Sequence, residues 1–364
     1  MGEPIQHAFF LLLKAGLWGR ELSSAPCFPL SKSQWKSLLS MASNHTVEGI
    51  VFEGMRRLPN KDLPPKDVVL PWTVRVDRIE RSNQWMNKVL GQQVRFFHKH
   101  NISACLLKGQ GLALCYDNPL RRVCGDIDWY FNTVDDYTRA NQLISEAGIA
   151  LTYTPGFSCN YIWNGCEIEH HRKMIDLYNP FAYRYLKRME MEQFENRKYL
   201  EVEGEQVVLP APLLTFVQVN AHILKHILSF GIGIRQLCDS ARMCYTYHKQ
   251  VDGNELKATY RRLGILRWVE LLHAILVKFI GLPKEYLPFA LSPDIDADWM
   301  MEEIWQAGNF GFHDARVDLQ QERDRNERVD VVGRWSSNFR KYVYYAPMEA
   351  VFFPLTQLYS RYVK

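Results

Sequence analysis

The stretch of sequence that decides the fold is GDIDWYF, at residues 125–131. Apart from its two aspartates it is apolar and aromatic, which is typical of a buried strand. Side chains two positions apart point to the same face of a strand, so Asp126 and Asp128 lie side by side while Ile127 enters the opposite face. Because adjacent carboxylates repel each other, the pair predicts a divalent cation between them, most plainly Mg²⁺. The alternative is an ordinary strand whose first carboxylates are solvated.

A glycine turn precedes this strand. The sequence SACLLKGQGLALCY at 103–116 predicts a short strand, a turn and a helix. Glycine lets the backbone approach a ligand closely, and N–H groups at a helix N-terminus attract phosphate oxygens. Basic side chains nearby can neutralise phosphate charge, unless they are exposed or held in structural ion pairs. The candidate phosphate-binding residues are Lys108, Gly109, Gln110, Gly111 and Arg122.

A third carboxylate comes from the run CEIEHH at 166–171, which follows an Asn164-Gly165 hairpin turn. Alternation along this strand lets Glu169 join the aspartate pair. Two-metal phosphoryl transfer needs such a set of carboxylates, and the third one can accept the proton of the attacking hydroxyl. The same acidic alternation is also typical of a solvated strand face.

Helical patterns flank this mixed region on both sides. We expect an α/β protein of the α+β type, with a small mixed-sheet core at 101–210, an N-terminal helical region at 1–100 and a C-terminal helical region at 211–364. We expect a loop at 59–71 and a solvated helix or linker in the charged run at 314–330. The other expected elements are helices at 5–17, 31–43, 46–57, 73–100 and 135–148, and strands at 149–154, 158–163 and 166–171.

Composition excludes several classes of protein. The 364 residues carry 44 basic and 40 acidic side chains, a net charge of +4 that falls far short of the basic footprint of a general nucleic-acid binder. The eight cysteines form no CxxC pair, and several lie in apolar runs, so we expect free thiols. The apolar run at 9–13 is too short to span a bilayer, and the one at 343–359 is interrupted by Glu349 and two prolines. We therefore expect a soluble, cytoplasmic protein that is not transmembrane.

Three motifs together resemble a known group of enzymes. LLKGQGLAL at 106–114, RVCGDID at 122–128 and IEHH at 168–171 are similar to the DNA polymerase β-like nucleotidyltransferase superfamily, and more narrowly to an uncharacterised bacterial nucleotidyltransferase family. The resemblance implies a small mixed sheet on which Asp126 and Asp128 bind metal and Glu169 is the third acid, with the Gly109 turn near the triphosphate. The sequence departs from the superfamily pattern at Gln110, where serine is frequent, and at Glu169, where aspartate is common.

The resemblance implies transfer of a nucleoside monophosphate (NMP) from a nucleoside triphosphate (NTP), ATP among them, with Mg²⁺ or Mn²⁺ and release of pyrophosphate. The acceptor is unidentified, and protein, RNA, a sugar or another small molecule all fit. One alternative is a noncatalytic nucleotide-binding or scaffolding protein on the same fold. Because the two aspartates should mainly repel each other without metal, we expect Asp128→Asn to leave the metal-free protein equally or slightly more stable.

Other charged and histidine motifs have simpler explanations. His222 and His226 share a helix face, a spacing that suits zinc but is more typical of a packed pair. A metal-dependent hydrolase would combine them with His170 or His171 at a place away from Asp126. Arg235 and Asp239, one helical turn apart, are expected to form an ion pair. The run Asp294-Ile295-Asp296 is expected to be a loop at a helix N-terminus, not a metal site.

Overall fold

A computed structural model describes residues 4–23, 25–154, 158–229, 231–308 and 338–362. The charged run at 314–330 lies outside these ranges. The chain is mostly helical, with a five-stranded mixed sheet and a separate two-stranded hairpin. The expected α/β class is therefore confirmed. All eight cysteines are free, as expected, and among the described residues no helix is both long and apolar enough to cross a membrane.

The strand order of the five-stranded sheet is β1-β2-β5-β4-β3. Strands β2 and β5 run parallel, and the other three neighbouring pairs are antiparallel. The β4–β5 hairpin turns at Asn164 and Gly165, both at positive φ (48° and 78°), as a two-residue turn of this kind requires. The strands are β1 (Ala104–Leu106), β2 (Asp126–Phe131), β3 (Thr152–Thr154), β4 (Ser158–Trp163) and β5 (Cys166–His171).

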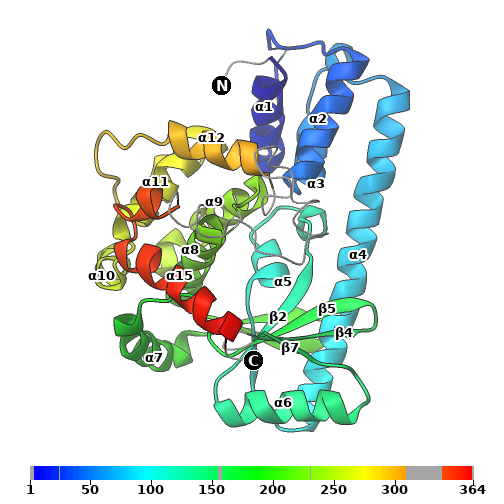
Figure 1. The fold of residues 1–364 in the computed structure, drawn as a ribbon. Coiled ribbons are helices and arrows are strands. Elements are labelled where there is room, and N and C mark those ends of the chain that lie inside the picture. Colours follow the sequence, from blue (N-terminus) through cyan, green and yellow to red (C-terminus); the bar gives the residue numbers. More distant parts are fainter. Residues whose placement is uncertain (1–3, 24, 155–157, 230, 309–337, 363–364) are drawn as a thin grey trace.

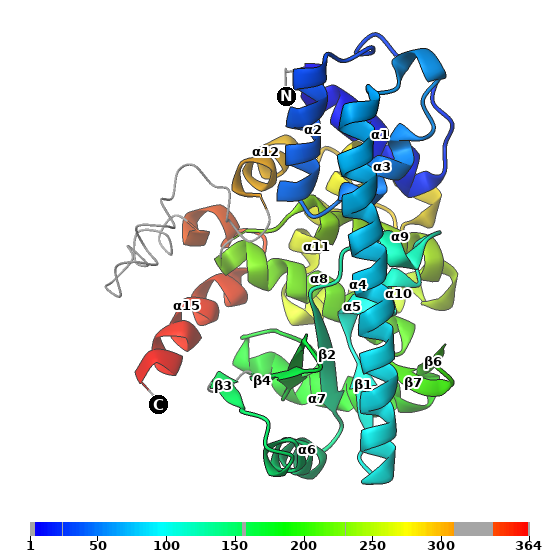
Figure 2. The same cartoon turned by 90° about the vertical axis from the view of Figure 1, so that its right-hand side faces the viewer.

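One face of the sheet is apolar. Ile127, Trp129 and Phe131 on β2 pack with residues of α4 (Lys66–Lys99) and α6 (Val134–Glu146). Figure 1 shows α6 below the sheet, and in Figure 2 the long helix α4 passes from the N-terminal helices down to the sheet. The structure corrects the start of α4, because residues expected to form a loop up to 71 are already helical from Lys66. Pro71 lies in the second turn of α4, where its missing N–H removes one helical hydrogen bond, the bond to the Asp67 carbonyl oxygen.

The opposite face of the sheet, which carries Asp126 and Asp128, is covered by α8 (Pro212–Ser229) and α9 (Ile234–Tyr247). Two elements between the sheet and α8 in the sequence were not predicted. They are helix α7 (Tyr183–Glu192) and a hairpin of β6 (Lys198–Val202) and β7 (Glu205–Leu209). The remaining helices are α1 (Pro4–Trp18), α2 (Lys32–Asn44), α3 (Glu48–Met55), α5 (Lys108–Ala113), α10 (Gly253–Leu263), α11 (Leu266–Ile275), α12 (Asp298–Ala307) and α15 (Pro347–Tyr362).

Helices α1 and α3 cross at backbone contact because each carries a glycine there. A Cβ atom on Gly54 would lie 1.8 Å from the Leu12 carbonyl oxygen, and one on Gly16 would lie 1.9 Å from the Ile50 carbonyl oxygen. A methyl group at either position would force the two helices apart.

We therefore predict that Gly54→Ala lowers the free energy of unfolding by about 2 kcal/mol, because overpacking outweighs the better helix propensity of alanine. Denaturant unfolding followed by circular dichroism measures this. Ser40→Ala, on the exposed face of α2, is the control and should change stability by less than about 0.5 kcal/mol. Equal stabilities of the two variants would contradict the close crossing.

Candidate active site

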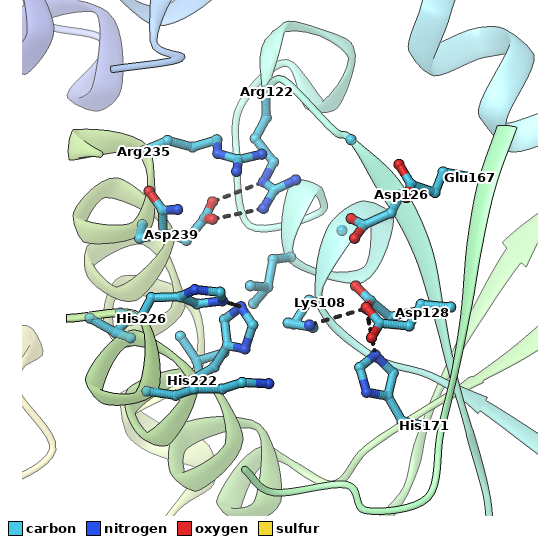
Figure 3. A pocket seen from close by; sticks show the side chains of 18 residues that line it. Lys108, Arg122, Asp126, Asp128, Glu167, His171, His222, His226, Arg235 and Asp239 are labelled. Carbon is cyan, nitrogen blue, oxygen red and sulfur yellow. Dashed lines mark hydrogen bonds and ion pairs between the residues drawn. The ribbon is translucent and has the colours of Figure 1, made fainter. Parts of the chain in front are cut away.

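A pocket of about 330 Å³ lies between the sheet and the helices α8 and α9. One wall is formed by β2, β5 and the start of α5, and the other by the helices (Figure 3). The carboxylates of Asp126, Asp128 and Glu169 all line it, together with Glu167. The three acids predicted from the sequence therefore share one cavity.

Register explains why the carboxylates line one pocket, although the close cluster of possible ligand atoms contains Asp128 and Glu169 and not Asp126. Strands β2 and β5 run parallel with Asp126 opposite Glu167 and Asp128 opposite Glu169. Since these residues alternate with apolar ones on both strands, all four side chains leave the same face of the sheet.

Asp128 is the centre of a compact polar cluster. Its Oδ1 atom lies 3.1 Å from Lys108 Nζ and 2.7 Å from His171 Nε2, and His171 Nε2 lies 3.4 Å from Glu169 Oε2. One potential ligand atom from each of Asp128, Glu169 and His171 lies within 4.8 Å of the other two, close enough for one metal ion. The positively charged ammonium group of Lys108 lies beside these ligand atoms, so the cluster already accommodates a cation.

The two aspartates differ in their protonation. The negative charge of Asp128, followed by burial, raises the pKa of Asp126 to about 6. Burial alone would also raise the pKa of Asp128, but the charge of Lys108 and the hydrogen bond from His171 hold it well below the ordinary value. Burial would lower the pKa of Lys108, but the charges of four acids raise it above the ordinary value: Asp128, Asp126, Glu169 and Asp176. Asp128 and Lys108 therefore form a charged pair. The repulsion between the two aspartates is seen in the raised pKa of Asp126.

The turn before the site has an unusual backbone. Lys108 and Gly109 both have positive φ (27° and 45°). A Cβ atom on Gly109 would lie 3.3 Å from the Asp126 carbonyl oxygen. This turn passes directly over the start of β2 and points the Lys108 side chain back at Asp128. Helix α5 (Lys108–Ala113) is only six residues long and contains this turn, because the backbone angles of Gly109 are not helical.

The other predicted phosphate-binding residues are placed differently. Gln110 and Gly111 are not among the described residues that line the pocket. The Gln110 side chain is buried, and Gly111 faces the β6–β7 hairpin, with Leu209 Cδ2 3.1 Å from where its Cβ would lie. Arg122 does line the pocket, but its guanidinium is bound to both oxygens of Asp239, at 2.9 and 2.7 Å.

This Arg122–Asp239 pair corrects the ion pair expected between Arg235 and Asp239. The carboxylate of Asp239 also accepts a hydrogen bond from Tyr116 Oη at 2.7 Å, so its oxygens are already engaged. Arg235 instead donates from Nη1 to the Val123 carbonyl oxygen at 2.6 Å. Long-range packing of α9 on the 118–123 loop therefore decides the partner, not helical spacing.

The histidines of the hydrolase hypothesis are divided between two places. His222 and His226 line the same pocket as Asp126, with their Nε2 atoms 3.1 Å apart and His222 Nδ1 3.4 Å from Asp176. His170 lies on the opposite face of the sheet, where it contacts Tyr161 and Asn141. A histidine site away from Asp126 is therefore not formed.

Sequence reasoning missed His171, Asp176 and Arg235 as parts of this pocket and its surroundings. Strand alternation contained the signal for His171, because it is two residues beyond Glu169 on the same face. The roles of the other two depend on contacts distant in sequence. The rival Asp294-x-Asp296 motif lies elsewhere, and Asp296 accepts the N–H of Asp298 at the start of α12, as expected.

Comparison with known proteins identifies the family of the chain. A model of a family described as "Uncharacterised nucleotidyltransferase" matches residues 31–281, more than half of the chain. The chain belongs to this family. No curated protein matches. Among solved structures, an antigenic nucleotidyltransferase-like protein from Paracoccidioides brasiliensis is similar at 15% identity and a TM-score of 0.32, over 54% of this chain and 92% of that one.

The pKa of Asp126 is raised and that of Asp128 is lowered. We therefore predict that replacing each with Asn changes the stability of the metal-free protein in opposite directions. The folded-state pKa of Asp126 lies above its unfolded value of about 4, so its ionisation costs stability as the pH rises through 6. At pH 8, Asp126→Asn should raise the free energy of unfolding by roughly 1–2 kcal/mol. Asp128 has a lowered pKa and is stabilising above pH 4, so Asp128→Asn should destabilise by about 2 kcal/mol or more, because it leaves Lys108 buried without its partner.

This prediction replaces the expectation from the sequence that Asp128→Asn leaves the metal-free protein equally or slightly more stable, because the Lys108 ammonium group already lies beside Asp128. Denaturant unfolding in a chelator at pH 8 and pH 4 measures both variants. The effect of Asp126→Asn should disappear at pH 4, where Asp126 is protonated in the folded protein, whereas the effect of Asp128→Asn should persist there, because Asp128 stays charged well below its ordinary pKa. Shifts of the same sign at pH 8 would contradict the assignment of the charged pair.

Proposed function

We propose that the protein transfers an NMP group from an NTP to a hydroxyl acceptor and releases pyrophosphate. The observation that carries this proposal is the convergence of Asp126, Asp128 and Glu169 in one pocket, beside the Lys108-Gly109 turn. Membership of a nucleotidyltransferase family supports it. The acceptor can be a protein, RNA, a sugar or another small molecule.

Asp126, Asp128 and Glu169 would hold Mg²⁺ or Mn²⁺, with His171 contributing to the ligand set. Such an ion, when bound, neutralises the phosphate chain and lowers the pKa of the attacking hydroxyl. Carboxylate oxygens suit Mg²⁺, and the imidazole nitrogen of His171 makes Mn²⁺ equally suitable.

The residues of the chain have separable roles in this proposal. Lys108, freed from Asp128 when a metal ion binds, would turn its ammonium group to a phosphate oxygen. The backbone at Gly109 can approach the phosphate chain because no side chain stands in the way. Glu169 would accept the proton of the acceptor hydroxyl, and His171 would orient both Glu169 and Asp128.

The noncatalytic alternative would keep nucleotide binding and lose transfer. The chain retains all three acids in the pocket, which favours an active enzyme. The hydrolase alternative is disfavoured because His171, His222 and His226 share the pocket with Asp126 and do not form a site away from it, and His170 is on the other side of the sheet.

We predict that Mg²⁺ and NTP bind cooperatively, because the ion links protein carboxylates to phosphate oxygens. Isothermal titration calorimetry with each NTP, in Mg²⁺ and in chelator, should show at least tenfold tighter binding with Mg²⁺. Since Asp126 must lose its proton to bind the ion and its pKa is about 6, Mg²⁺ affinity should fall about tenfold from pH 7 to pH 5. Tight NTP binding that a chelator leaves unchanged would contradict this prediction.

We also predict that Asp128→Asn abolishes transfer. Loss of a ligand that stabilises transition-state charge costs several kcal/mol, so the rate should fall by at least ~100-fold. The measurement is transfer of label from α-labelled NTP in cell extract with Mg²⁺. Glu167→Gln is the matched control, because Glu167 lines the pocket two residues before Glu169 but is more exposed. Equal activity of Asp128→Asn and wild type would exclude Asp128 as a metal ligand, and no transfer with any NTP in wild type would favour the noncatalytic alternative.

A further inference from the structure

Arg235 is a pocket cation that forms no direct ion pair with a carboxylate of the described chain, although the more distant charges of Asp239 and Asp126 favour its charged form. It stands on the first turn of α9 and lines the wall opposite Asp126 (Figure 3). The acid nearest to it in sequence, Asp239, binds Arg122 through both oxygens. Within the described ranges, no carboxylate oxygen lies at ion-pair distance from Arg235, whereas Lys108, Arg122 and Lys225 on the same pocket each have one.

One hydrogen bond holds the guanidinium of Arg235 in place, but not all of its N–H donors have acceptors among the described residues. Its Nη1 donates to the Val123 carbonyl oxygen at 2.6 Å, which fixes the side chain against the 118–123 loop. Its Nε is buried and has no hydrogen-bond acceptor among the described residues. A buried donor without an acceptor costs about 1–3 kcal/mol, and more when it is charged.

The surroundings make this arrangement costlier still. Burial, followed by the like charge of Arg122, lowers the pKa of Arg235. A guanidinium nevertheless stays protonated in proteins, so it cannot relieve the cost by losing its proton. An anion that enters the pocket would relieve it.

We propose that Arg235 binds a phosphate group of the substrate, across the pocket from the carboxylate site. The choice of phosphate over other anions rests on the proposed function. The forked, planar guanidinium matches phosphate oxygens in two-point hydrogen bonds, and the neutralised Arg122–Asp239 pair leaves Arg235 as the cation available to them. The phosphate comes either from the NTP chain or from a phosphorylated acceptor.

The test uses Arg235→Met, which keeps the apolar stem and removes the charge, and Arg235→Lys, which keeps the charge and removes the fork. Arg81→Met is the matched control, because Arg81 pairs with Asp77 on the exposed surface of α4. The probes are pyrophosphate with Mg²⁺, a non-hydrolysable NTP analogue with Mg²⁺, and inorganic phosphate added to the protein already saturated with that analogue. Calorimetry gives each affinity, and thermal unfolding of the unliganded protein gives stability.

We expect Arg235→Met to weaken phosphate binding by at least tenfold with little change in melting temperature, because removal of a buried charge beside Arg122 offsets the loss of the hydrogen bond to Val123. Arg235→Lys should retain part of the affinity. Weaker pyrophosphate and NTP analogue binding assigns the phosphate to the NTP, and weaker inorganic phosphate binding alone assigns it to the acceptor. Wild-type affinity of Arg235→Met for all three probes, or a fall in melting temperature with unchanged affinity, would overturn the proposal.

Calorimetry and thermal unfolding measure binding and stability, and neither requires the protein to be catalytically active. A protein that transfers no NMP but loses phosphate affinity in Arg235→Met would refute the transferase proposal and support this one. The reverse result, normal phosphate affinity in Arg235→Met with metal-dependent transfer by wild type, would refute only the role of Arg235.

Discussion

The repulsion between Asp126 and Asp128 is the constraint on which the rest of the site depends. Strand geometry places the two carboxylates on one face, and helices α8 and α9 close over that face, so water cannot screen them fully. The protein meets the cost with one buried cation, Lys108, delivered by a left-handed turn at residues 108 and 109. A buried ion pair is weak evidence for added stability, but its loss on one side only is costly. The pair neutralises one of two adjacent carboxylates in the pocket that we propose binds metal.

The helical parts of the chain hold this pocket from two sides. On the apolar face, α4 and α6 pack on Ile127, Trp129 and Phe131, which fixes the direction of the β2 side chains. On the other, Asp239 of α9 anchors Arg122, and Asn83 of α4 donates to the Leu120 and Arg122 carbonyl oxygens at 2.7 and 2.8 Å. The loop before β2 is therefore held by hydrogen bonds to two helices that are distant in sequence.

Much of the sheet was predictable because its signals are local. Alternation at 126–131 and 166–171 identified the faces of β2 and β5, and the Asn164-Gly165 turn identified their hairpin neighbour. The β6–β7 hairpin has a comparable signal, alternation around a Glu203-Gly204 turn, and was overlooked. Partner choice was not predictable: Arg122 and Asp239 are 117 residues apart, and only the packing of α9 on the 118–123 loop brings them together. The direction of Lys108 depends on a positive φ that a lysine rarely adopts.

The most direct test of the proposed metal site is a crystal structure with Mn²⁺ and a non-hydrolysable NTP analogue, with the ion located by its anomalous scattering. We expect an anomalous peak between Asp126 and Asp128, within ligand distance of Glu169 or His171. We also expect Lys108 Nζ to have left Asp128 for a phosphate oxygen. An anomalous peak at His222 and His226 would contradict this metal site. So would bound nucleotide with Lys108 still paired to Asp128 and no ion beside it.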